Sequence, residues 1–426
     1  MRALFFPSYL GGGFGHAARC LALADAWRQA GHHAEFALNG PHFARVRDAG
    51  FTTHALTSMR LPAPSQHQPA FFFVSGLAFQ FVRDGFDSPR AVEHAVREGM
   101  AVCRACKPDV LIADYWPVAR LVAHACGLPL VQIVESFSHP QGLPLIWWES
   151  PPPGLVEPDV RPIINPVLRR YGLSEIEQAE ELSWGDLMLV PSISEIDPLP
   201  VNDAHTHYVG ALVRTTREDV PAWMANLDPN RPVIYVSVGG AASSAGGVDF
   251  FRTVAAAFDQ SCFQVVISTG GSLPVDAIGR MPDNIRVERW VPGAAMLDRC
   301  DLVVFHGGYT RMEVLTRGLS SVVIPFQSEQ ESYGRRMQAA GAAMVVPYSS
   351  AEWQIRRIRW AGQNVTVVYR PQADLKPAIL RQAVERALDD PAYRRVAQVL
   401  QARLAEAGGA VRAVRLIEEA VTTFCR

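Results

Sequence analysis

The chain has 426 residues, of which 49% are hydrophobic and 19% are charged, and its formal net charge is −2. This length predicts about two or three domains, each able to bury a large core. A charge balance so close to neutral argues against a protein that binds nucleic acid or another polyanion.

The N-terminus and the hydropathy of the chain predict a cytoplasmic protein. The opening stretch MRALFFPSYLGGG reaches glycines before the apolar core of a signal peptide is complete. No run approaches the ~20 apolar residues that a membrane-spanning helix needs. A peripheral contact with a membrane through exposed apolar side chains stays open.

The seven cysteines are scattered and odd in number, so we expect no disulfide framework. Cys103 and Cys106 form a single CxxC motif in an alanine-rich helical stretch, with no second pair nearby. Because a structural zinc site needs four ligands, we interpret both as packing residues and expect no metal ion.

In the first half of the chain, short apolar runs of the buried parallel-strand type alternate with stretches of helical spacing. Strands are expected at 2–8, 32–39, 108–115 and 128–135, and helices at 16–31, 40–50 and 116–127. A proline- and aromatic-rich segment, 138–183, interrupts the pattern, which resumes with a strand at 187–192. This alternation predicts a doubly wound parallel sheet.

A second alternating series begins at Arg231. Strands are expected at 231–240, 263–269, 284–291, 302–308, 320–326 and 342–347, and helices at 249–260, 310–318 and 330–341. The segment 349–374 fits less well and is interpreted as an insertion or an extra hairpin. Three helices close the chain, at 375–390, 391–408 and 410–425.

The predicted fold class is therefore α/β, with two Rossmann-like halves that face each other across a cleft. Ligands bind in such clefts at the carboxyl ends of the strands. We place an N-terminal domain at 1–212, a linker at 213–230, a C-terminal domain at 231–408 and a final helix at 409–426.

The strongest motif is VVFHGGYTRMEVLTRGLSSVVIPFQSEQ, residues 303–330. A strand ends at His306-Gly307-Gly308, where glycines let backbone amides approach an anion and the next helix adds partial positive charge. Thr310 is placed to cap that helix or to donate to a phosphate, and Glu313 to accept from ribose hydroxyls. After the next strand, Glu329 and Gln330 face the same cleft.

This region resembles the donor-binding signature of the GT-B nucleotide-sugar glycosyltransferases, the inverting family that includes macrolide and plant UDP-glycosyltransferases. A tryptophan and a proline precede the signature, here Trp290 and Pro292, and the H-G-G-x-[ST]-x-x-E motif and the closing acidic-Gln pair both follow. The resemblance implies donor-binding roles for Ser237, Gly239, Trp290, Val291, His306, Gly307, Gly308, Thr310, Glu313, Glu329 and Gln330. In its terms His306 and the following amides hold the diphosphate, Glu313 the ribose and the last pair the sugar hydroxyls.

The same resemblance assigns the acceptor to the N-terminal domain. A histidine in the first strand-to-helix loop is the family's general base, and an aspartate about a hundred residues later orients it. His16, in GGGFGHAARC, and Asp114, in PDVLIADYWP, match these positions. Histidine suits this task because its pKa lies near ~6.5 and a carboxylate can fix its tautomer. The alternatives are a structural histidine and an aspartate that caps a helix.

The motif around His16 departs from the family at Arg19, where many relatives have proline. GHAARCLALADA also resembles a G-H-x-x-R-C-L-x-L-A pattern of GT-B nucleotide-sugar hydrolases that act in sialic-acid-like pathways. In such an enzyme His16 would activate water instead of an organic hydroxyl. The departure at Arg19 therefore affects whether the acceptor is water or an organic hydroxyl, and it does not affect the expected use of a sugar donor.

Two aromatic segments, 69–86 and 136–150, favour an organic acceptor. In the family, loops of this domain line the acceptor pocket, and apolar side chains there would contact a hydrophobic aglycone. We assign the acceptor site to Gly13, Phe14, Phe72, Phe79, Trp147 and Trp148. The alternative for the phenylalanines is an ordinary place in the helix core.

These patterns predict a metal-independent hexosyltransferase-type enzyme of bacterial natural-product or antibiotic biosynthesis. It would move a sugar from a UDP or dTDP sugar to a hydroxyl of a small hydrophobic acceptor, with no cofactor other than this co-substrate. Partners would be the nucleotide sugar, the acceptor and at most a weak homodimer. A nucleotide-sugar hydrolase or epimerase, and a non-catalytic sugar-nucleotide-binding partner protein, are the alternatives. The resemblance also implies that the final helix crosses back onto the N-terminal domain.

Overall fold

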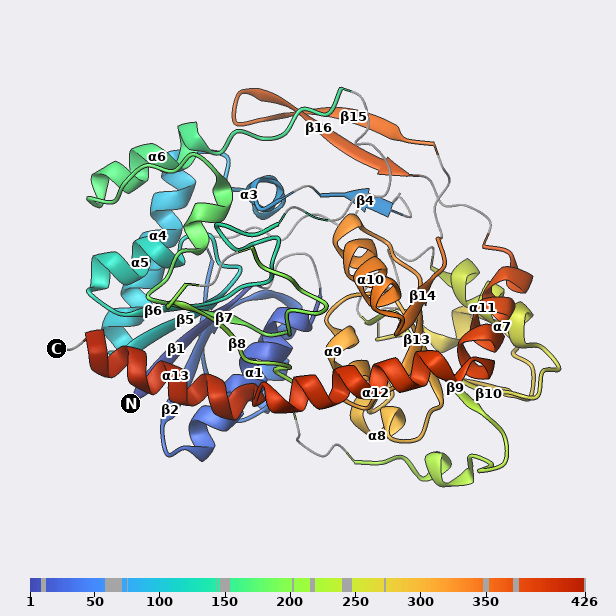
Figure 1. The fold of residues 1–426 in the computed structure, drawn as a ribbon. Coiled ribbons are helices and arrows are strands. Elements are labelled where there is room, and N and C mark those ends of the chain that lie inside the picture. The colour runs from blue at the N-terminus through green and yellow to red at the C-terminus, as the bar shows by residue number, and fades with distance from the viewer. Residues whose placement is uncertain are drawn as a thin grey trace.

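The computed structural model describes residues 1–8, 13–57, 71–74, 76–143, 145, 154–200, 203–214, 219–239, 247–271, 273–347, 352–370 and 375–424. Of Pro41, Phe71 and Phe72 it describes the backbone alone. Two parallel sheets lie side by side, each covered by helices, and Figure 1 shows one on the left and one on the right. The prediction of two Rossmann-like domains is confirmed.

The N-terminal sheet is parallel throughout and has the order β3-β2-β1-β5-β6-β7-β8. Its strands are β1 (Arg2–Pro7), β2 (His33–Leu38), β3 (Thr52–Ala55), β5 (Val110–Asp114), β6 (Leu130–Ile133), β7 (Leu187–Val190) and β8 (Thr206–Tyr208). The strand order reverses between β1 and β5, where Pro7 pairs with Asp114. This is the switch point at which doubly wound folds bind ligands.

The described helices of this half separate its strands along the chain. They are α1 (Gly15–Gln29), α2 (Phe43–Asp48), α3 (Ala78–Asp84), α4 (Pro89–Cys106), α5 (Ala119–Cys126) and α6 (Arg161–Arg170), with 3-10 helices at Gly40–His42 and Ala179–Ser183. The helix α6 was not expected. Pro162 lies in its first turn and Pro166 lies inside it. Because proline disfavours a helix interior, the sequence of this segment did not indicate a helix.

The C-terminal sheet has the order β11-β10-β9-β12-β13-β14 and is also parallel. Its strands are β9 (Val233–Ser237), β10 (Gln264–Ser268), β11 (Ile285–Glu288), β12 (Leu302–Phe305), β13 (Ser320–Val323) and β14 (Ala343–Val345). Its switch point lies between β9 and β12, where Ser237 pairs with Phe305. The two glycine-containing loops that follow these strands therefore leave the sheet side by side.

The described helices of the second half are α7 (Val248–Phe258), α8 (Gly293–Leu297), α9 (Thr310–Leu315), α10 (Ser328–Ala340), α11 (Pro377–Asp389), α12 (Pro391–Glu406) and α13 (Gly409–Phe424), with 3-10 helices at Ala222–Asn226 and Val275–Ala277. The change from one sheet to the other falls between Tyr208 and Val233. That interval brackets the expected linker, and the domain limits themselves stay a prediction.

The last two helices connect the halves along one side of the molecule (Figure 1). α13 packs on α1 and buries Ala413, Val414, Ile417 and Val421 in the N-terminal core. A carboxylate oxygen of Glu418 also lies 2.8 Å from Nε2 of His32. The expected return of the final helix to the N-terminal domain is confirmed.

A second connection lies on the opposite side of the molecule (Figure 1). The strands β15 (Gln354–Trp360) and β16 (Gln363–Arg370) form a hairpin, and β16 pairs antiparallel with β4 (Phe71–Phe73) of the first half. The Thr366 hydroxyl also accepts a hydrogen bond from the Val156 amide at 2.9 Å. Of the two interpretations of segment 349–374, the described residues support the hairpin.

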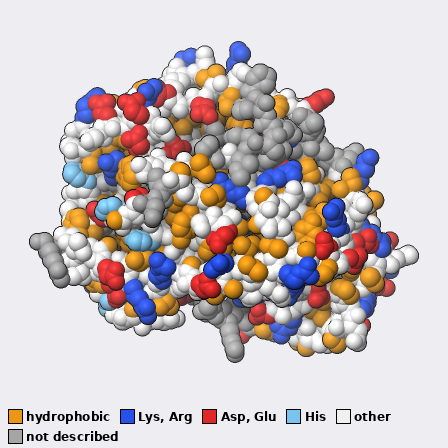
Figure 2. Space-filling view, in the orientation of Figure 1, with side chains coloured by type: hydrophobic (Ala, Val, Ile, Leu, Met, Phe, Trp, Pro, Cys, Tyr) orange, Lys and Arg blue, Asp and Glu red, His pale blue; other side chains and the backbone are white. Residues whose placement is uncertain are grey.

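Surface charge and cysteine placement agree with the composition. On the face drawn in Figure 2, acidic and basic side chains are interspersed rather than gathered by sign. Cys103 and Cys106 are buried at the end of α4, and the six cysteines in the described part of the chain are free thiols. No described helix combines the length and the apolar character needed to cross a bilayer.

Replacing Ile417 by alanine should weaken the attachment of α13. Ile417 is fully buried against the N-terminal core, and such truncations cost roughly 2–4 kcal/mol of unfolding free energy. Amides of α1 should then exchange faster with solvent in hydrogen-exchange mass spectrometry. Val411→Ala is the matched control, because Val411 is on the same helix with its side chain 58% exposed. Equal effects of both changes would contradict the packing described for α13.

Candidate active site

The predicted catalytic residues meet at the switch point of the N-terminal sheet. His16 is the second residue of α1, and Asp114 is the last residue of β5. His16 Nδ1 lies 2.9 Å from Asp114 Oδ1, although 98 residues separate them along the chain. In the tautomer that carries its proton on Nδ1, His16 donates to Asp114 and keeps a lone pair on Nε2. His16 is partly exposed, whereas Asp114 is fully buried.

Arg19 contacts both members of this pair from the next turn of α1. Its Nε and Nη2 donate to the two Asp114 carboxylate oxygens, each at 2.7 Å, a bidentate arrangement. The same Nη2 lies 3.0 Å from His16 Nδ1. Burial alone would raise the pKa of Asp114, but Arg19 and then His16 hold it below its usual value. Asp114 is therefore a fixed carboxylate.

The backbone beside Asp114 is strained. Tyr115 has a φ of 58°, in the left-handed region that residues other than glycine seldom adopt. Its ring lies 4.9 Å from the His16 ring, measured between centroids. Such strain costs on the order of 1–3 kcal/mol and persists where the surroundings demand it. The turn thus positions Asp114 beneath Arg19 and places an aromatic ring against the histidine.

Sequence reasoning missed two charged residues that extend this group. Glu135 follows β6, and one of its oxygens lies 3.2 Å from Arg19 Nη1. Its other oxygen accepts a hydrogen bond from Arg311 in α9, on the other half of the chain. Burial would raise the pKa of Glu135, but Arg19 and Arg311 lower it to about 2. A charged residue just after a buried strand was the available signal, and its partners lay too far away in sequence to be inferred.

A further buried ion pair crosses the same boundary. Arg336 of α10 donates to Asp197 at 2.9 Å and to the Ser136 hydroxyl at 2.6 Å. The Tyr309 hydroxyl accepts from the backbone amide of Leu212 at 2.9 Å. Polar groups of the C-terminal half therefore contact the N-terminal half at several points.

Gly15 permits the close approach of α1 to the second half. A Cβ atom added at Gly15 would lie 3.2 Å from Cβ of Tyr309. The Arg19 guanidinium also lies over the Tyr309 ring, 4.8 Å from its centroid. Gly13, by contrast, has open space around it. Of the glycines before His16, Gly15 is thus the described one at which a side chain would collide with the opposite half, and Gly11 and Gly12 lie outside the described residues.

His306 sits between the two loops that follow β9 and β12. A Cβ at Gly239 would come within 3.3 Å of its ring, and one at Gly308 would collide with it. Gly239 also has a φ of 57°, which favours glycine. Burial lowers the pKa of His306 to about 4, so the ring is neutral near pH 7. Its buried Nδ1 has no hydrogen-bond partner among the described residues. An orphaned polar atom beside two glycine loops fits an anion-binding role in which hydrogen bonds replace charge.

The other donor-site residues gather near these loops. Gly307 packs against the Gln330 backbone carbonyl so closely that a Cβ would collide with it. The Gln330 side chain accepts from the Phe326 amide at 2.9 Å. Burial, followed by the nearby charge of Glu135, raises the pKa of Glu329. The two parts of the predicted signature are thus adjacent.

The N-terminus of α9 differs in detail from the expectation. The helix begins at Thr310 and its N-cap is Tyr309, without a side-chain capping bond. The Thr310 hydroxyl is therefore not the cap, and its predicted contact with a phosphate stays open. Glu313 lies one turn further, and its charge acts on the buried Tyr235 in the middle of β9. Ser237 also acts on Tyr235, so Glu313 and Ser237 both lie near this residue.

The two residues expected to flank the nucleotide base, Trp290 and Val291, lie in different environments. Trp290 is 47% exposed, and the Arg45 guanidinium of α2 stacks on its ring 4.5 Å from the centroid. Arg45 also lies over Phe14, 5.1 Å from that ring, so the three side chains bridge the two halves. The Val291 side chain is buried in the core, which leaves its backbone to contact a base.

The predicted acceptor wall is described only in part. Phe79 packs in the N-terminal hydrophobic core, the alternative that the sequence left open for the phenylalanines. Phe72 is described as a backbone position of β4, and Trp147 and Trp148 lie outside the described residues. The acceptor roles of these residues therefore stay predictions.

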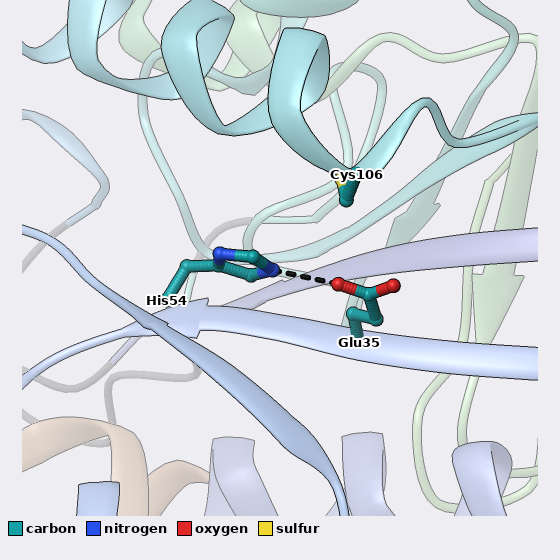
Figure 3. Close-up of side chains that lie close together, drawn as sticks. All are labelled: Glu35, His54 and Cys106. Atoms are coloured by element: carbon teal, nitrogen blue, oxygen red, sulfur yellow. Dashed lines mark hydrogen bonds and ion pairs between the residues drawn. The ribbon is translucent and has the colours of Figure 1, made fainter.

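One group of metal-ligating side chain types occurs among the described residues, away from His16. Glu35 of β2, His54 of β3 and Cys106 at the end of α4 bring their ligand atoms within 4.8 Å of one another (Figure 3). His54 Nε2 lies 2.7 Å from a Glu35 oxygen, and the Arg2 guanidinium lies 3.9 Å from the other. Burial raises the pKa of Cys106 to about 11. Glu35 therefore already has two partners, His54 and Arg2.

Comparisons with known proteins find glycosyltransferases among the relatives of this chain. A family model described as the C-terminal domain of erythromycin biosynthesis protein CIII-like proteins matches residues 256–366. The NDP-glycosyltransferase YjiC of Bacillus subtilis is 22% identical over 95% of this chain and 94% of its own length. The 4'-demethylrebeccamycin synthase of Lentzea aerocolonigenes is 26% identical over 81% of each chain.

Solved structures match over nearly the full length. The spinosyn rhamnosyltransferase SpnG, complexed with thymidine diphosphate, aligns with a TM-score of 0.69 at 19% identity, covering 98% of this chain and 100% of that chain. The same protein complexed with spinosyn aglycone aligns with a TM-score of 0.69 at 20% identity over the same shares. At this level of identity the likeness concerns the fold.

Replacing His306 by asparagine should remove one source of acid sensitivity. An unfolded histidine takes up a proton near pH ~6.5, whereas the folded His306 resists protonation until about pH 4. The wild type should therefore lose up to about 3 kcal/mol of unfolding free energy from this group as the pH falls through that window. Denaturant unfolding at several pH values should show the difference between wild type and variant shrinking towards pH 4.

The matched control is the same substitution at His94, an exposed histidine on α4. A pH dependence of equal size in that variant would mean that the burial of His306 is not its cause.

Proposed function

We propose, on the premise that this chain is a glycosyltransferase of the UDP-glycosyltransferase-like GT-B family, that it transfers a sugar from a nucleoside diphosphate to an organic hydroxyl. The observation that carries the proposal is the His16–Asp114 pair at one switch point, opposite the glycine loops at the other. The proposed reaction inverts the anomeric carbon.

The chemistry follows from the positions of these groups. His16 Nε2 removes the proton of the acceptor hydroxyl as its oxygen attacks the anomeric carbon, and the bond to the diphosphate oxygen breaks. Asp114 holds the proton on Nδ1 and stabilises the imidazolium that forms. Attack from the face opposite the diphosphate gives inversion. His16 then carries the proton and releases it to solvent or to the departing nucleoside diphosphate.

The proposed donor site uses hydrogen bonds in place of a bound cation. The amides of Gly307 and Gly308 and the neutral His306 would hold the diphosphate as negative charge develops on the leaving oxygen. Glu313 would accept from the ribose, and Glu329 and Gln330 from the sugar hydroxyls. The thymidine diphosphate complex of a structural neighbour supports a UDP or dTDP sugar as the co-substrate.

The proposed acceptor is a small hydrophobic natural product. Supporting this are the rebeccamycin relative and the neighbour crystallised with its spinosyn aglycone. Gly13, Phe14 and the aromatic segments would contact it from the N-terminal side. The proposed setting is the cytoplasm of a bacterium, with the two small molecules as partners.

One observation favours a second candidate, a nucleotide-sugar hydrolase. Arg19 neutralises the carboxylate that orients His16, and the G-H-x-x-R-C pattern around it resembles the hydrolases. In that case His16 would activate water. The ordered pair of His16 and Asp114 argues against a non-catalytic binding partner, which would need neither.

A panel of UDP and dTDP sugars, incubated with and without organic acceptors and followed by mass spectrometry, should yield a glycoside only when an acceptor is present. His16→Ala should lower that turnover by roughly 10²–10⁴-fold, since general base catalysis is lost, while donor affinity stays nearly unchanged. The exposed His94→Ala serves as control. Free sugar formed at the same rate without acceptor would identify a hydrolase, and full activity of His16→Ala would refute the assigned base.

Glu313→Gln should weaken nucleotide binding without removing the general base. A hydrogen bond to a charged group contributes ~1.5–3 kcal/mol, so affinity should fall by roughly 10- to 100-fold. Isothermal titration calorimetry with UDP and dTDP measures this. Glu385→Gln is the control, because Glu385 lies on α11 and pairs with Arg381 away from the glycine loops. Unchanged affinity in Glu313→Gln would remove Glu313 from the donor site.

A further inference from the structure

We propose that Arg19 is a positioning residue for His16, and that the donor-side half sets its position through Glu135, which Arg19 shares with Arg311. This inference rests on the proposed function only where it speaks of catalysis. The contacts themselves, and the titration of His16, can be measured without any substrate.

The contacts form one continuous chain across the boundary between the halves. Arg19 holds both Asp114 oxygens at 2.7 Å and reaches one Glu135 oxygen at 3.2 Å. Arg311 donates to the other Glu135 oxygen and stacks on the Tyr333 ring, 3.6 Å from its centroid. Each of these charged side chains is at most 2% exposed. Solvent therefore screens their interactions little.

Arg19 and Asp114 compete for the same edge of the His16 ring. Asp114 Oδ1 is 2.9 Å from Nδ1 and favours a proton there, which frees Nε2 to act as a base. Arg19 Nη2 is 3.0 Å from that nitrogen and would donate to it in the other tautomer, which leaves the proton on Nε2. The attraction between Glu135 and Arg19 therefore affects which tautomer His16 adopts.

Arg311 controls how strongly Glu135 attracts Arg19. With Arg311 in place, the Glu135 charge is divided between two guanidiniums. Without it, the undivided carboxylate would draw Arg19 away from Asp114 and His16. Arg311 directly follows Thr310 in α9, beside the loop proposed to hold the diphosphate. A change in how the C-terminal half packs on the N-terminal half would thus change the surroundings of His16, the proposed general base.

Other charged and titratable groups act on His16 as well. From the first half they are Asp114, Arg19, Tyr115, Glu135 and Asp84, the last on α3 beside Arg83. From the second half the charge of Glu329 acts on it, Tyr309 lies against Gly15, the residue before His16, and Arg311 acts through Glu135. Glu135 and Arg311 have opposite charges, so removing each should move the His16 titration in opposite directions. A loss of packing alone would produce no such opposition.

The buried pair of Arg336 and Asp197 provides the matched control. It crosses the same boundary, is equally buried and holds the Ser136 hydroxyl. It makes no contact with Arg19 among those described, although the charges of Glu135 and Arg311 also act on Asp197. Arg336→Gln should therefore loosen the boundary and move the His16 titration by less than the changes at Glu135 and Arg311 do.

The experiment follows the imidazole resonances of His16 by NMR over pH 4–9 in the full chain, with His16→Gln to assign them. Glu135→Gln removes a negative charge and should lower the midpoint by about half a pH unit or more. Arg311→Gln should raise it by a similar amount. Arg19→Lys keeps the positive charge but loses the two-pronged guanidinium, so it should change the midpoint less than Arg19→Met does. Arg19→Met should raise the midpoint most.

Shifts of the same sign in Glu135→Gln and Arg311→Gln, or shifts no larger than that of Arg336→Gln, would overturn the inference. The acidic limb of kcat/KM should move with the NMR midpoint if His16 is the base. Opposite shifts combined with full transfer activity of His16→Ala would keep the inference and reject the assigned base. Lost activity in His16→Ala without opposite shifts would keep the base and reject the inference.

Discussion

Two buried carboxylates, Asp114 and Glu135, impose the main constraint on this structure. A carboxylate without a partner in the protein interior costs several kcal/mol, so each must be matched by a buried cation. Arg19 matches the first and shares the second with Arg311, which belongs to the other half of the chain. The need to neutralise these groups therefore ties the first turns of α1 to α9.

The constraint also accounts for details around it. Arg19 lies over the Tyr309 ring, and Gly15 lets the start of α1 approach the Cβ of that residue. The strained turn at Tyr115 follows directly on Asp114 and presents a ring to His16. Since a buried ion pair adds little net stability compared with apolar packing, its value lies in fixing geometry. Here the geometry that it fixes is that of His16.

The donor side follows a different principle. His306 is neutral near pH 7, its Nδ1 has no partner in the described part of the chain, and its ring occupies space left by Gly239 and Gly308. Parallel strands place the loops after β9 and β12 next to each other because Ser237 and Phe305 are in register. The surroundings of His16 thus consist of paired charges, and those of His306 of polar groups beside glycine loops.

The sequence by itself determined the alternation of strands and helices, which short stretches reveal through local periodicity. The pairing of His16 with Asp114 came from the resemblance to a glycosyltransferase family, and the strand order that puts both at a switch point came from the structure. The sequence missed α6, because Pro162 and Pro166 mask a helical pattern, and it left Arg19 unexplained. Only the tertiary structure decided the partners of Arg19. Glu135 and Arg311 are 176 residues apart, and no local signal shows which buried charges neutralise one another across such a distance.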